Sequence, residues 1–243
     1  MAEDNKGQLA LVTGAARRLG RDLAVCLAEL GYDLILHYHD SATDVEKTRG
    51  DILSIGSRAY IVQGDLADSD DINRIFNQID DMGKPLKIMV NSASVMKAGR
   101  IGNVSLDDMD LELDLNLRAP FICAQSAAMR MKPGGVIINI SDVGASKTWT
   151  RYPAYSVSKA GLDSLTRILA KALAPAIRVN AIAPGLVYKS DGMTQKEWDD
   201  LIGKVPMRRA AQPVEIKSAL EFLVKNEYVT GQIIYVDGGY SLV

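Results

Sequence analysis

Short apolar runs alternate with longer amphipathic segments along nearly the whole chain, and this alternation is what most restricts the fold. The runs, such as LALV and VIINI, are continuously hydrophobic, which is typical of strands covered on both faces. In the segments between them, apolar residues recur every three to four positions, which favours helices. Strands are therefore expected at 8–13, 33–38, 59–63, 87–90, 136–141, 177–182 and 233–236.

Repeated strand–helix units predict an α/β fold with a doubly wound, mostly parallel, seven-stranded sheet and helices on both faces. The clearest helical patterns lie at 19–30 and 162–173, and one long helix is expected at 107–130 after a start signal at Ser105. No repeat, low-complexity tract or linker divides the 243 residues. We therefore expect one Rossmann-type domain over 1–243.

Charge and composition argue against several other classes of protein. The formal net charge of −2 gives no reason to expect a nucleic-acid partner or an anionic membrane surface. No apolar stretch approaches the ~18 residues of a membrane span, and the polar start MAEDNKGQ is unlike a signal peptide. Cys26 and Cys123 lie far apart in apolar helical contexts, where inert buried thiols are expected. We expect a cytoplasmic protein.

One long connection departs from the alternation. After the sixth strand, residues 183–212 carry several prolines and glycines around a short expected helix at 194–202. Long connections inside compact domains are more often functional than idle, and ligands bind at the carboxyl ends of parallel strands. We therefore expect a lid over the ligand at about 186–212.

The turn after the first strand has the features of a pyrophosphate site. Gly14 and Gly20 stand at its two ends. Between them the candidate cofactor contacts are Arg17, Arg18 and Leu19. Glycine lets the backbone approach a phosphate, and the N-terminus of the following helix attracts the anion. A tight strand–helix turn without a ligand can have the same sequence features. The position of this turn directly after the first strand is what favours a dinucleotide site.

The end of the second strand indicates which dinucleotide is bound. Basic and polar groups there accept the 2′-phosphate of NADP, whereas an inward acidic residue selects NAD. Tyr38, His39 and Ser41, together with Arg17, favour NADP(H) as the cofactor. Asp40 favours NAD only if its carboxylate points inward. The His-x-His pair has no other histidine and no ligand cluster near it, so no metal site is expected.

Tyr155 and Lys159 form the candidate proton-transfer pair. Their spacing of four residues places them on one face at the start of a helix. An unperturbed tyrosine has a pKa near ~10, and a neighbouring cation together with the positive nicotinamide ring is expected to lower that pKa and stabilise the phenolate. Alone, this pattern is usually a solvated pair; combined with a dinucleotide turn, it indicates acid–base chemistry.

With these motifs, the chain resembles the short-chain dehydrogenase/reductase family over essentially its whole length, from the Gly14 turn to the terminal Val-Asp-Gly-Gly. The resemblance implies that Asn116 holds Lys159 through water and completes a proton relay. It also implies a homotetramer. Further cofactor contacts implied by the family come from Asp65, Leu66, Asn91, Ala93, Pro184, Gly185 and Leu186.

Two departures from the family pattern point to one subgroup. Arg18 stands where the family has the central glycine of the first turn. Asp142 stands thirteen residues before Tyr155, where the family has its catalytic serine, and Ser141 is displaced by one. Both changes occur in the pteridine reductases and the related dihydromonapterin/dihydrofolate reductases, which the segments GAARRLGR and LHYHDSA also resemble. In that subgroup the arginine contacts pyrophosphate and pterin, and the aspartate works with the tyrosine.

Three positions differ from that subgroup. Met96 stands where pteridine reductases place an aromatic ring that stacks on the pterin, and a methionine there serves either as a soft contact to a ring or in packing. Asp40 replaces a basic residue, and Val187 replaces a serine. These changes bear on the substrate and on the choice of NADP over NAD, but not on hydride transfer.

Together, these residues predict NADPH-dependent reduction of a pterin or dihydrofolate-type ring. Reduction of a C=N bond requires a hydride at carbon and a proton at nitrogen, which a carboxyl group beside a tyrosine can position. The catalytic set is Tyr155, Lys159, Asp142 and Asn116, and the substrate set is Arg18, Ser94, Met96, Asp142 and Tyr155. One alternative is a carbonyl reductase acting on 3-oxoacyl carriers, sugars or small ketones. The other is a catalytically silent NADP-binding protein, which the intact catalytic residues oppose.

Overall fold

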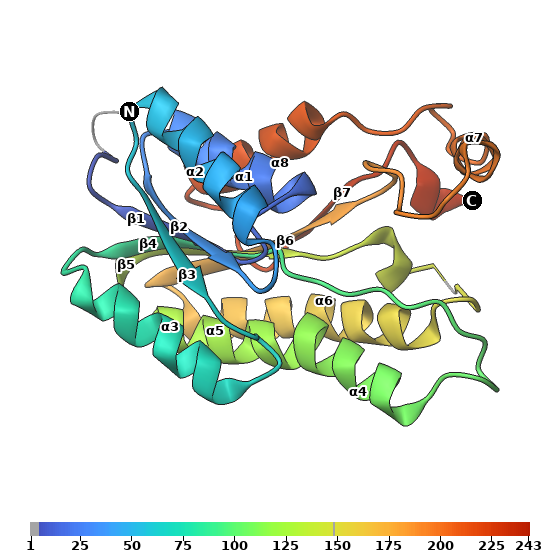
Figure 1. The fold of residues 1–243 in the computed structure, drawn as a ribbon, viewed down its shortest axis with the longest axis horizontal. Helices are drawn as coiled ribbons and strands as arrows, with labels where there is room; N and C mark the ends of the chain where they lie inside the picture. Colours follow the sequence, from blue (N-terminus) through green and yellow to red (C-terminus); the bar gives the residue numbers. More distant parts are fainter. Residues whose placement is uncertain (1–4, 148) are drawn as a thin grey trace.

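The apolar runs of the sequence form a seven-stranded sheet that lies between two layers of helices (Figure 1). The computed structural model describes residues 5–147 and 149–243; residues 1–4 of the polar start and residue 148 lie outside the described residues. The strand order is β3-β2-β1-β4-β5-β6-β7, and every neighbouring pair is parallel. The predicted doubly wound α/β sheet is confirmed, and it is parallel throughout.

The strands match the expected runs closely. Their bounds are β1 Leu9–Val12, β2 Asp33–Tyr38, β3 Ala59–Gln63, β4 Leu86–Asn91, β5 Met131–Ile140, β6 Ile177–Pro184 and β7 Ile233–Val236. β5 begins earlier than expected because Met131 pairs with Leu86 ahead of a register shift. Along β1, Leu9 and Leu11 face one core cluster, and Ala10 and Val12 face the other. Both faces of the sheet are therefore buried, which explains the continuous hydrophobicity.

The helices cover the two faces in separate layers (Figure 1). One layer consists of α1 Arg18–Glu29, α2 Ala42–Ile55 and α8 Pro213–Lys225. The other consists of α3 Ser69–Asp81, α4 Leu106–Leu113, α5 Ala119–Ala128 and α6 Pro153–Leu173. Both cysteines lie in these layers, and burial raises the pKa of the Cys26 thiol to about 11 and that of the Cys123 thiol to about 12.

The long helix expected at 107–130 is interrupted by one π-helical turn. Ser105 caps α4 by accepting the Asp108 N–H at 3.1 Å, as the start signal predicts. The turn η1, Asp114–Arg118, then joins α4 to α5. A single π turn inside an α-helix shifts the side chains that follow it and is frequent at functional sites. This turn carries Asn116.

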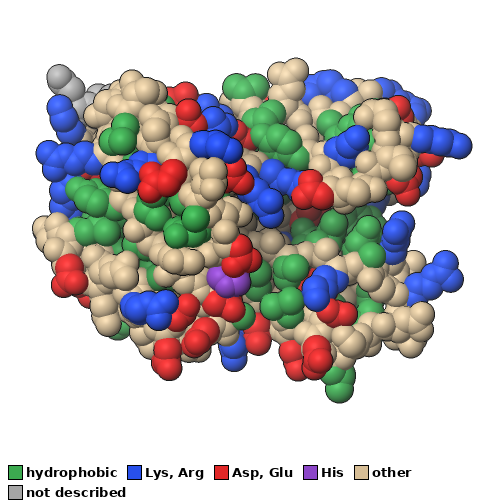
Figure 2. Space-filling model, viewed as in Figure 1, with side chains coloured by type: hydrophobic (Ala, Val, Ile, Leu, Met, Phe, Trp, Pro, Cys, Tyr) green, Lys and Arg blue, Asp and Glu red, His purple; other side chains and the backbone are tan. Residues whose placement is uncertain are grey.

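The carboxyl ends of the strands lie at one edge of the sheet, toward the right of Figure 1. There they meet the N-terminus of α6 and the β6–α8 connection, which contains α7 Gln195–Ile202. On the face shown in Figure 2, the surface is hollowed between the part that contains α7 and the part that contains α4. In the described part of the chain, no helix has both the length and the apolar character that a membrane crossing needs.

Candidate active site

The β1–α1 turn brings the backbone unusually close to itself. Gly14 has a φ of +65°, and a Cβ on it would lie 3.0 Å from the Ala93 Cα. A Cβ on Gly20 would lie 2.1 Å from the Gly14 carbonyl oxygen, so no other residue fits there. Arg18 has a φ of +51°, a left-handed conformation that explains why the family pattern has glycine at this position.

The N-terminus of α1 is open for an anion. The helix has no side-chain cap and no acidic residue in its first turn. Its first N–H groups therefore lack helical partners, and the positive end of the helix dipole is not neutralised by the chain. This arrangement is suited to a phosphate.

His37, which the sequence analysis treated only as half of a His-x-His pair, supports this turn from beneath. It is 2% exposed; its Nδ1 accepts the Gly14 N–H at 3.2 Å, and its Nε2 lies 3.0 Å from the Gly64 carbonyl oxygen. These contacts place the ring proton on Nε2, which donates to Gly64. Burial lowers the pKa of His37 to about 4, so the ring is neutral at physiological pH. In the sequence, this role could have been inferred from the presence of a histidine inside an otherwise apolar strand.

The side chains after β2 are turned toward solvent. His39 is 57% exposed, with its Nδ1 3.3 Å from a carboxylate oxygen of Asp40, which is itself 83% exposed. Asp40 and His39 therefore lie side by side at the surface after β2. No cluster of metal-ligating side chains occurs among the described residues.

The candidate catalytic side chains meet at the N-terminal end of α6. Tyr155 is 6% exposed, and its hydroxyl is hydrogen-bonded to the Asp142 carboxylate and to the Ser94 hydroxyl. Lys159 is 2% exposed, and its ammonium donates to the Ile140 carbonyl oxygen at 2.9 Å. The Lys159 nitrogen lies 5.7 Å from the centre of the Tyr155 ring. The sequence spacing of four therefore does place both groups at one point.

The pKa values of the three titratable groups at this point, Asp142, Tyr155 and Lys159, are all shifted. Burial raises the pKa of Asp142 to about 6, although its carboxylate accepts the Gly144 N–H at 2.6 Å. Burial also lowers the pKa of Lys159 to about 8. Burial and the negative charge of Asp142 raise the pKa of Tyr155 well above 10. The lowering of this pKa expected from Lys159 together with the positive nicotinamide ring concerns the cofactor complex, and it stays a prediction; in the protein alone, burial and Asp142 raise the pKa.

Ser141 does not share this centre. Its hydroxyl donates to the Asp163 carboxylate at 2.5 Å, on α6. The backbone of Asp142 is extended, and successive side chains of an extended segment point to opposite sides. The residue that faces Tyr155 is therefore Asp142, whereas its neighbour is used to hold α6 against the end of β5.

Asn116 is buried, and both ends of its amide group make hydrogen bonds, but none of these bonds is to Lys159. Its Oδ1 accepts the Ser94 O–H and the Val95 N–H, each at 2.9 Å. Its Nδ2 donates to the Val95 carbonyl at 2.8 Å and to the Ser158 hydroxyl at 3.1 Å. In this structure the side chain fixes the segment that follows β4 against α6. The water-mediated link to Lys159 stays a prediction.

Two polar side chains align the neighbouring strands: Thr13, which the sequence patterns missed, and Asn91, which was expected as a cofactor contact. The Thr13 hydroxyl accepts the Ser92 and Ala93 N–H groups at 2.9 and 3.1 Å. Asn91 donates to Asn139 at 2.8 Å. Of the other predicted cofactor contacts, Leu66 is buried, and the Asp65 carboxylate accepts the Ala67 N–H at 2.9 Å. The ends of β1 and β4 are thus held together below the turn.

The predicted lid reaches back to the start of α1. Its short helix, expected at 194–202, is α7, and Thr194 caps it. Arg18 donates to the Asp191 carboxylate at 2.6 Å, and the Tyr188 hydroxyl donates to the Asp22 carboxylate. At the base of the lid, Pro184 ends β6 buried, and Gly185 is so close to β7 that a Cβ would lie 2.8 Å from the Asp237 Cα. The partner of Arg18 in this structure is therefore the segment 186–212.

Met96 and Ser94 lie at the surface of the segment after β4, where Met96 is 41% exposed. Leu186 packs instead into a small apolar cluster with Val143, Val205 and Tyr240.

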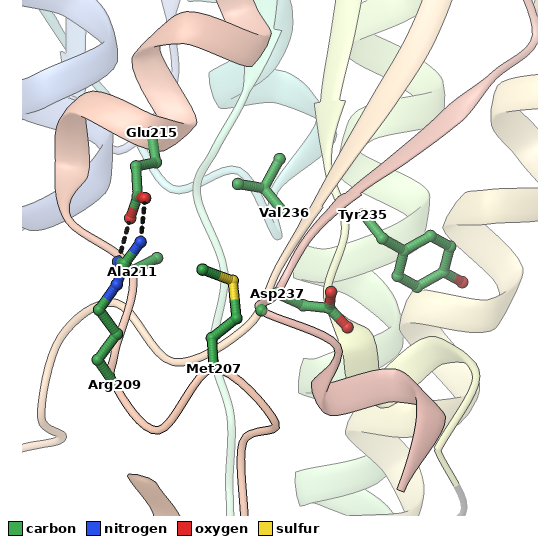
Figure 3. Close-up of a pocket in the computed structure, with 8 residues that line it drawn as sticks. Met207, Arg209, Ala211, Glu215, Tyr235, Val236 and Asp237 are labelled. Carbon is green, nitrogen blue, oxygen red and sulfur yellow. Dashed lines mark hydrogen bonds and ion pairs between the residues drawn. The ribbon is translucent and has the colours of Figure 1, made fainter.

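A separate cavity of about 190 Å³ lies beyond the end of β7 (Figure 3). Arg209 and Glu215 close one side of it through two hydrogen bonds of 2.6 and 2.7 Å, which hold the pKa of Glu215 at about 2. None of the predicted site residues lines it. Its lining consists of Met207, Arg209, Ala211, Glu215, Tyr235, Val236, Asp237 and Gly238.

Comparison with known proteins places this geometry in context. A family model described as Enoyl-(Acyl carrier protein) reductase matches residues 14–241. A 3-oxoacyl-[acyl-carrier-protein] reductase from Synechocystis sp. is 32% identical over 238 residues, which cover 96% of each chain. FolM Alternative dihydrofolate reductase 1 from Brucella canis, solved complexed with NADP, matches with a TM-score of 0.92 at 31% identity, covering 98% of this chain and 96% of that one. A mutant short-chain dehydrogenase/reductase from Serratia marcescens matches with a TM-score of 0.92 at 29% identity, covering 98% and 99%.

Proposed function

This chain belongs to the short-chain dehydrogenase/reductase family, and on that premise we propose that it uses NADPH to reduce a C=N bond of a pterin or dihydrofolate-type ring. The proposal depends above all on Asp142, whose carboxyl group is hydrogen-bonded to the Tyr155 hydroxyl where the family pattern has a serine. Similarity to a FolM dihydrofolate reductase supports the same substrate class.

The β1–α1 turn fits the pyrophosphate of a dinucleotide. Gly14 and Gly20 allow the close backbone approach, and the uncapped N-terminus of α1 offers N–H donors. We place the 2′-phosphate of NADP among Arg17 and the basic and polar groups at the end of β2, namely Tyr38, His39 and Ser41. The FolM structure solved with NADP supports this choice. When bound, NADPH supplies the hydride.

The protein's own side chains manage the proton. The high pKa of Tyr155 keeps the hydroxyl protonated, which is the form that donates to the substrate nitrogen. With a pKa of about 6, Asp142 takes up a proton near neutral pH and returns it to the Tyr155 oxygen. The buried ammonium of Lys159 stabilises the phenolate formed between these steps.

Three side chains border the space where we place the substrate. Met96 offers a polarizable apolar contact to a ring face, and Ser94 is hydrogen-bonded to the Tyr155 hydroxyl. Arg18 is paired with Asp191, so an anionic or polar ligand edge competes with the lid for this guanidinium. We infer from this contact that residues 186–212 act as a lid.

A carbonyl reductase is the second candidate, and the 32% identity to a 3-oxoacyl-[acyl-carrier-protein] reductase favours it. A ketone needs its proton only at the carbonyl oxygen, which Tyr155 and Lys159 suffice to supply. On that reading the carboxyl group of Asp142 has no separate task.

Oxidation of NADPH, followed by absorbance, separates the two candidates. Dihydrobiopterin, dihydrofolate and an acetoacetyl thioester are supplied separately at equal concentration. Turnover of the pterins alone supports the first candidate, and turnover of the thioester alone supports the second. Asp142→Ser is the matched variant: the first candidate expects pterin turnover to fall by about 100-fold, and the second expects thioester turnover to be retained. NADPH binding without any turnover contradicts both.

We also propose a homotetramer, which the family resemblance implies. Large apolar side chains are exposed on the second helix layer and need a partner surface, namely Leu106, Phe121, Met129, Val157 and Ile168. Light scattering measures the assembly directly, and a monomer contradicts this proposal.

A further inference from the structure

Glu112 is a buried carboxylate outside the catalytic set. It lies in α4 and is 1% exposed, whereas Asp107 and Asp110 on the same helix are exposed. Ionisable carboxyl groups are rarely buried to this degree unless specific partners hold them.

The partners of Glu112 are two backbone N–H groups from different parts of the chain. Its Oε1 accepts the Lys97 N–H at 2.6 Å, and its carboxylate also accepts the backbone N–H of Tyr155. Tyr155 is the third residue of α6, so its N–H is one of the four that the helix cannot satisfy itself. Tyr152, at the N-cap position, provides no side-chain cap. Glu112 therefore caps the catalytic helix from a neighbouring helix.

Asn116, four residues further on, makes the equivalent pair of contacts. It binds Ser94 and Val95 on the segment after β4 and Ser158 on α6. Glu112 binds Lys97 on the same segment and Tyr155 on the same helix. Two side chains on the α4–η1 helix thus bridge residues 94–97 to the start of α6 at two successive points.

We propose that Glu112 is a positioning residue for the reduction proposed above, on which this role rests: it clamps the backbone of Tyr155 to the segment that carries Ser94 and Met96. The distance between the proton donor and the substrate wall then depends on this carboxylate together with the Asn116 amide. A small error in such a distance is costly, since a displacement of about 1 Å can reduce a rate by about 100-fold.

The charge of Glu112 has a second effect, because it lies close to the tyrosine that donates the proton. Together with the nearer charge of Asp142, it raises the pKa of Tyr155 and keeps the hydroxyl protonated. The charged and titratable groups that face Glu112 are Lys97, Asp108 and Tyr155, and burial raises the pKa of Glu112 itself. Glu112→Ala removes both the clamp and the charge, whereas Glu112→Gln keeps an acceptor oxygen and removes only the charge.

Amide hydrogen exchange tests the clamp independently of any activity. In the wild-type protein the Lys97 and Tyr155 amides should exchange slowly, and in Glu112→Ala both should lose their protection. Asp110→Asn removes an exposed carboxylate from the same helix and should leave both amides protected. Protection that persists in Glu112→Ala overturns the proposal. If that variant does not fold, Glu112→Gln replaces it: a neutral acceptor is weaker than a carboxylate, so both amides should exchange faster than in the wild type.

Kinetics of the full-length enzyme test the consequence for the reaction. Glu112→Ala should lower kcat by about tenfold while the KM for NADPH stays within about twofold, since the clamp does not touch the β1–α1 turn. Glu112→Gln should keep most of kcat and move to lower pH the limb that belongs to Tyr155, which lies at higher pH than the Asp142 limb; an unmoved Tyr155 limb overturns the role of the charge. If the wild type reduces none of the substrates, the proposed function fails, and hydrogen exchange still decides whether the clamp exists.

Discussion

Ser141 and Asp163 are joined by a hydrogen bond of 2.5 Å at the end of β5, and this contact commits the hydroxyl group to α6. The next side chain, Asp142, is the one bonded to the Tyr155 hydroxyl. The two neighbours are therefore not interchangeable, and the presence of a serine one position from the family's usual site does not restore that site.

Proton delivery should depend on Asp142 in a defined pH range. Because the pKa of Asp142 is raised to about 6, the carboxyl group holds its proton below that pH and loses it above. We expect kcat/KM for pterin reduction to fall as the pH rises through about 6, since this ratio reports groups of the free enzyme. Asp142→Asn should abolish this limb, and Ser141→Ala should retain it. A limb that survives in Asp142→Asn contradicts the assignment.

His37 should make folding stability depend on pH in the acidic range. Its pKa is about 4 when folded and 6.5 as the ordinary value, so the unfolded chain binds more protons between these limits. Stability is therefore full above pH 6.5 and is lost as the pH falls toward 4, by about 3 kcal/mol in all. Urea unfolding across this range measures it. His37→Asn should flatten the dependence relative to the wild type, whereas His39→Asn, at an exposed position, should not; equal slopes for all three proteins would refute the prediction.

Two glycines in helices should respond to alanine in opposite directions. A Cβ at position 20 would lie 2.1 Å from the Gly14 carbonyl oxygen, so Gly20→Ala should destabilise the fold by at least about 3 kcal/mol and weaken NADPH binding. Gly50, within α2, has nothing within 4 Å of a Cβ, so Gly50→Ala should stabilise by about 0.5–1 kcal/mol. Thermal unfolding distinguishes them, and a neutral Gly20→Ala would show that the turn can open.

The contact between Arg18 and Asp191 should restrain the lid only weakly. Both side chains are substantially exposed, at 40% and 84%, and exposed pairs contribute no more than about 1 kcal/mol. Asp191→Ala should therefore raise the rate of limited proteolysis within 186–212 by up to about fivefold. NADPH should slow cleavage in both proteins. Cleavage that is indifferent to both changes would argue against a lid that responds to ligand.

Local patterns determined much of this protein in advance. The alternation of strands and helices depends on side-chain periodicity within each segment, so the sheet and its helix layers followed from sequence. The same holds for the Tyr155–Lys159 pair, because a spacing of four residues fixes a shared helix face, and for the glycines of the first turn. Each of these features depends on residues that are near one another in the chain.

Only the tertiary structure decided which side chains of the candidate site contact one another. The contacts of Glu112 with Lys97 and Tyr155, of His37 with Gly14 and Gly64, and of Arg18 with Asp191 join residues from distant parts of the chain. The direction of the Tyr155 pKa shift in the protein alone also depends on the tertiary structure, because desolvation is set by what surrounds a group and not by its neighbours in sequence. Hydrophobic periodicity indicates which face of a helix or strand is buried. Which charged groups meet in the site is set by how different helices and strands pack together, and periodicity within each element carries no information on that packing.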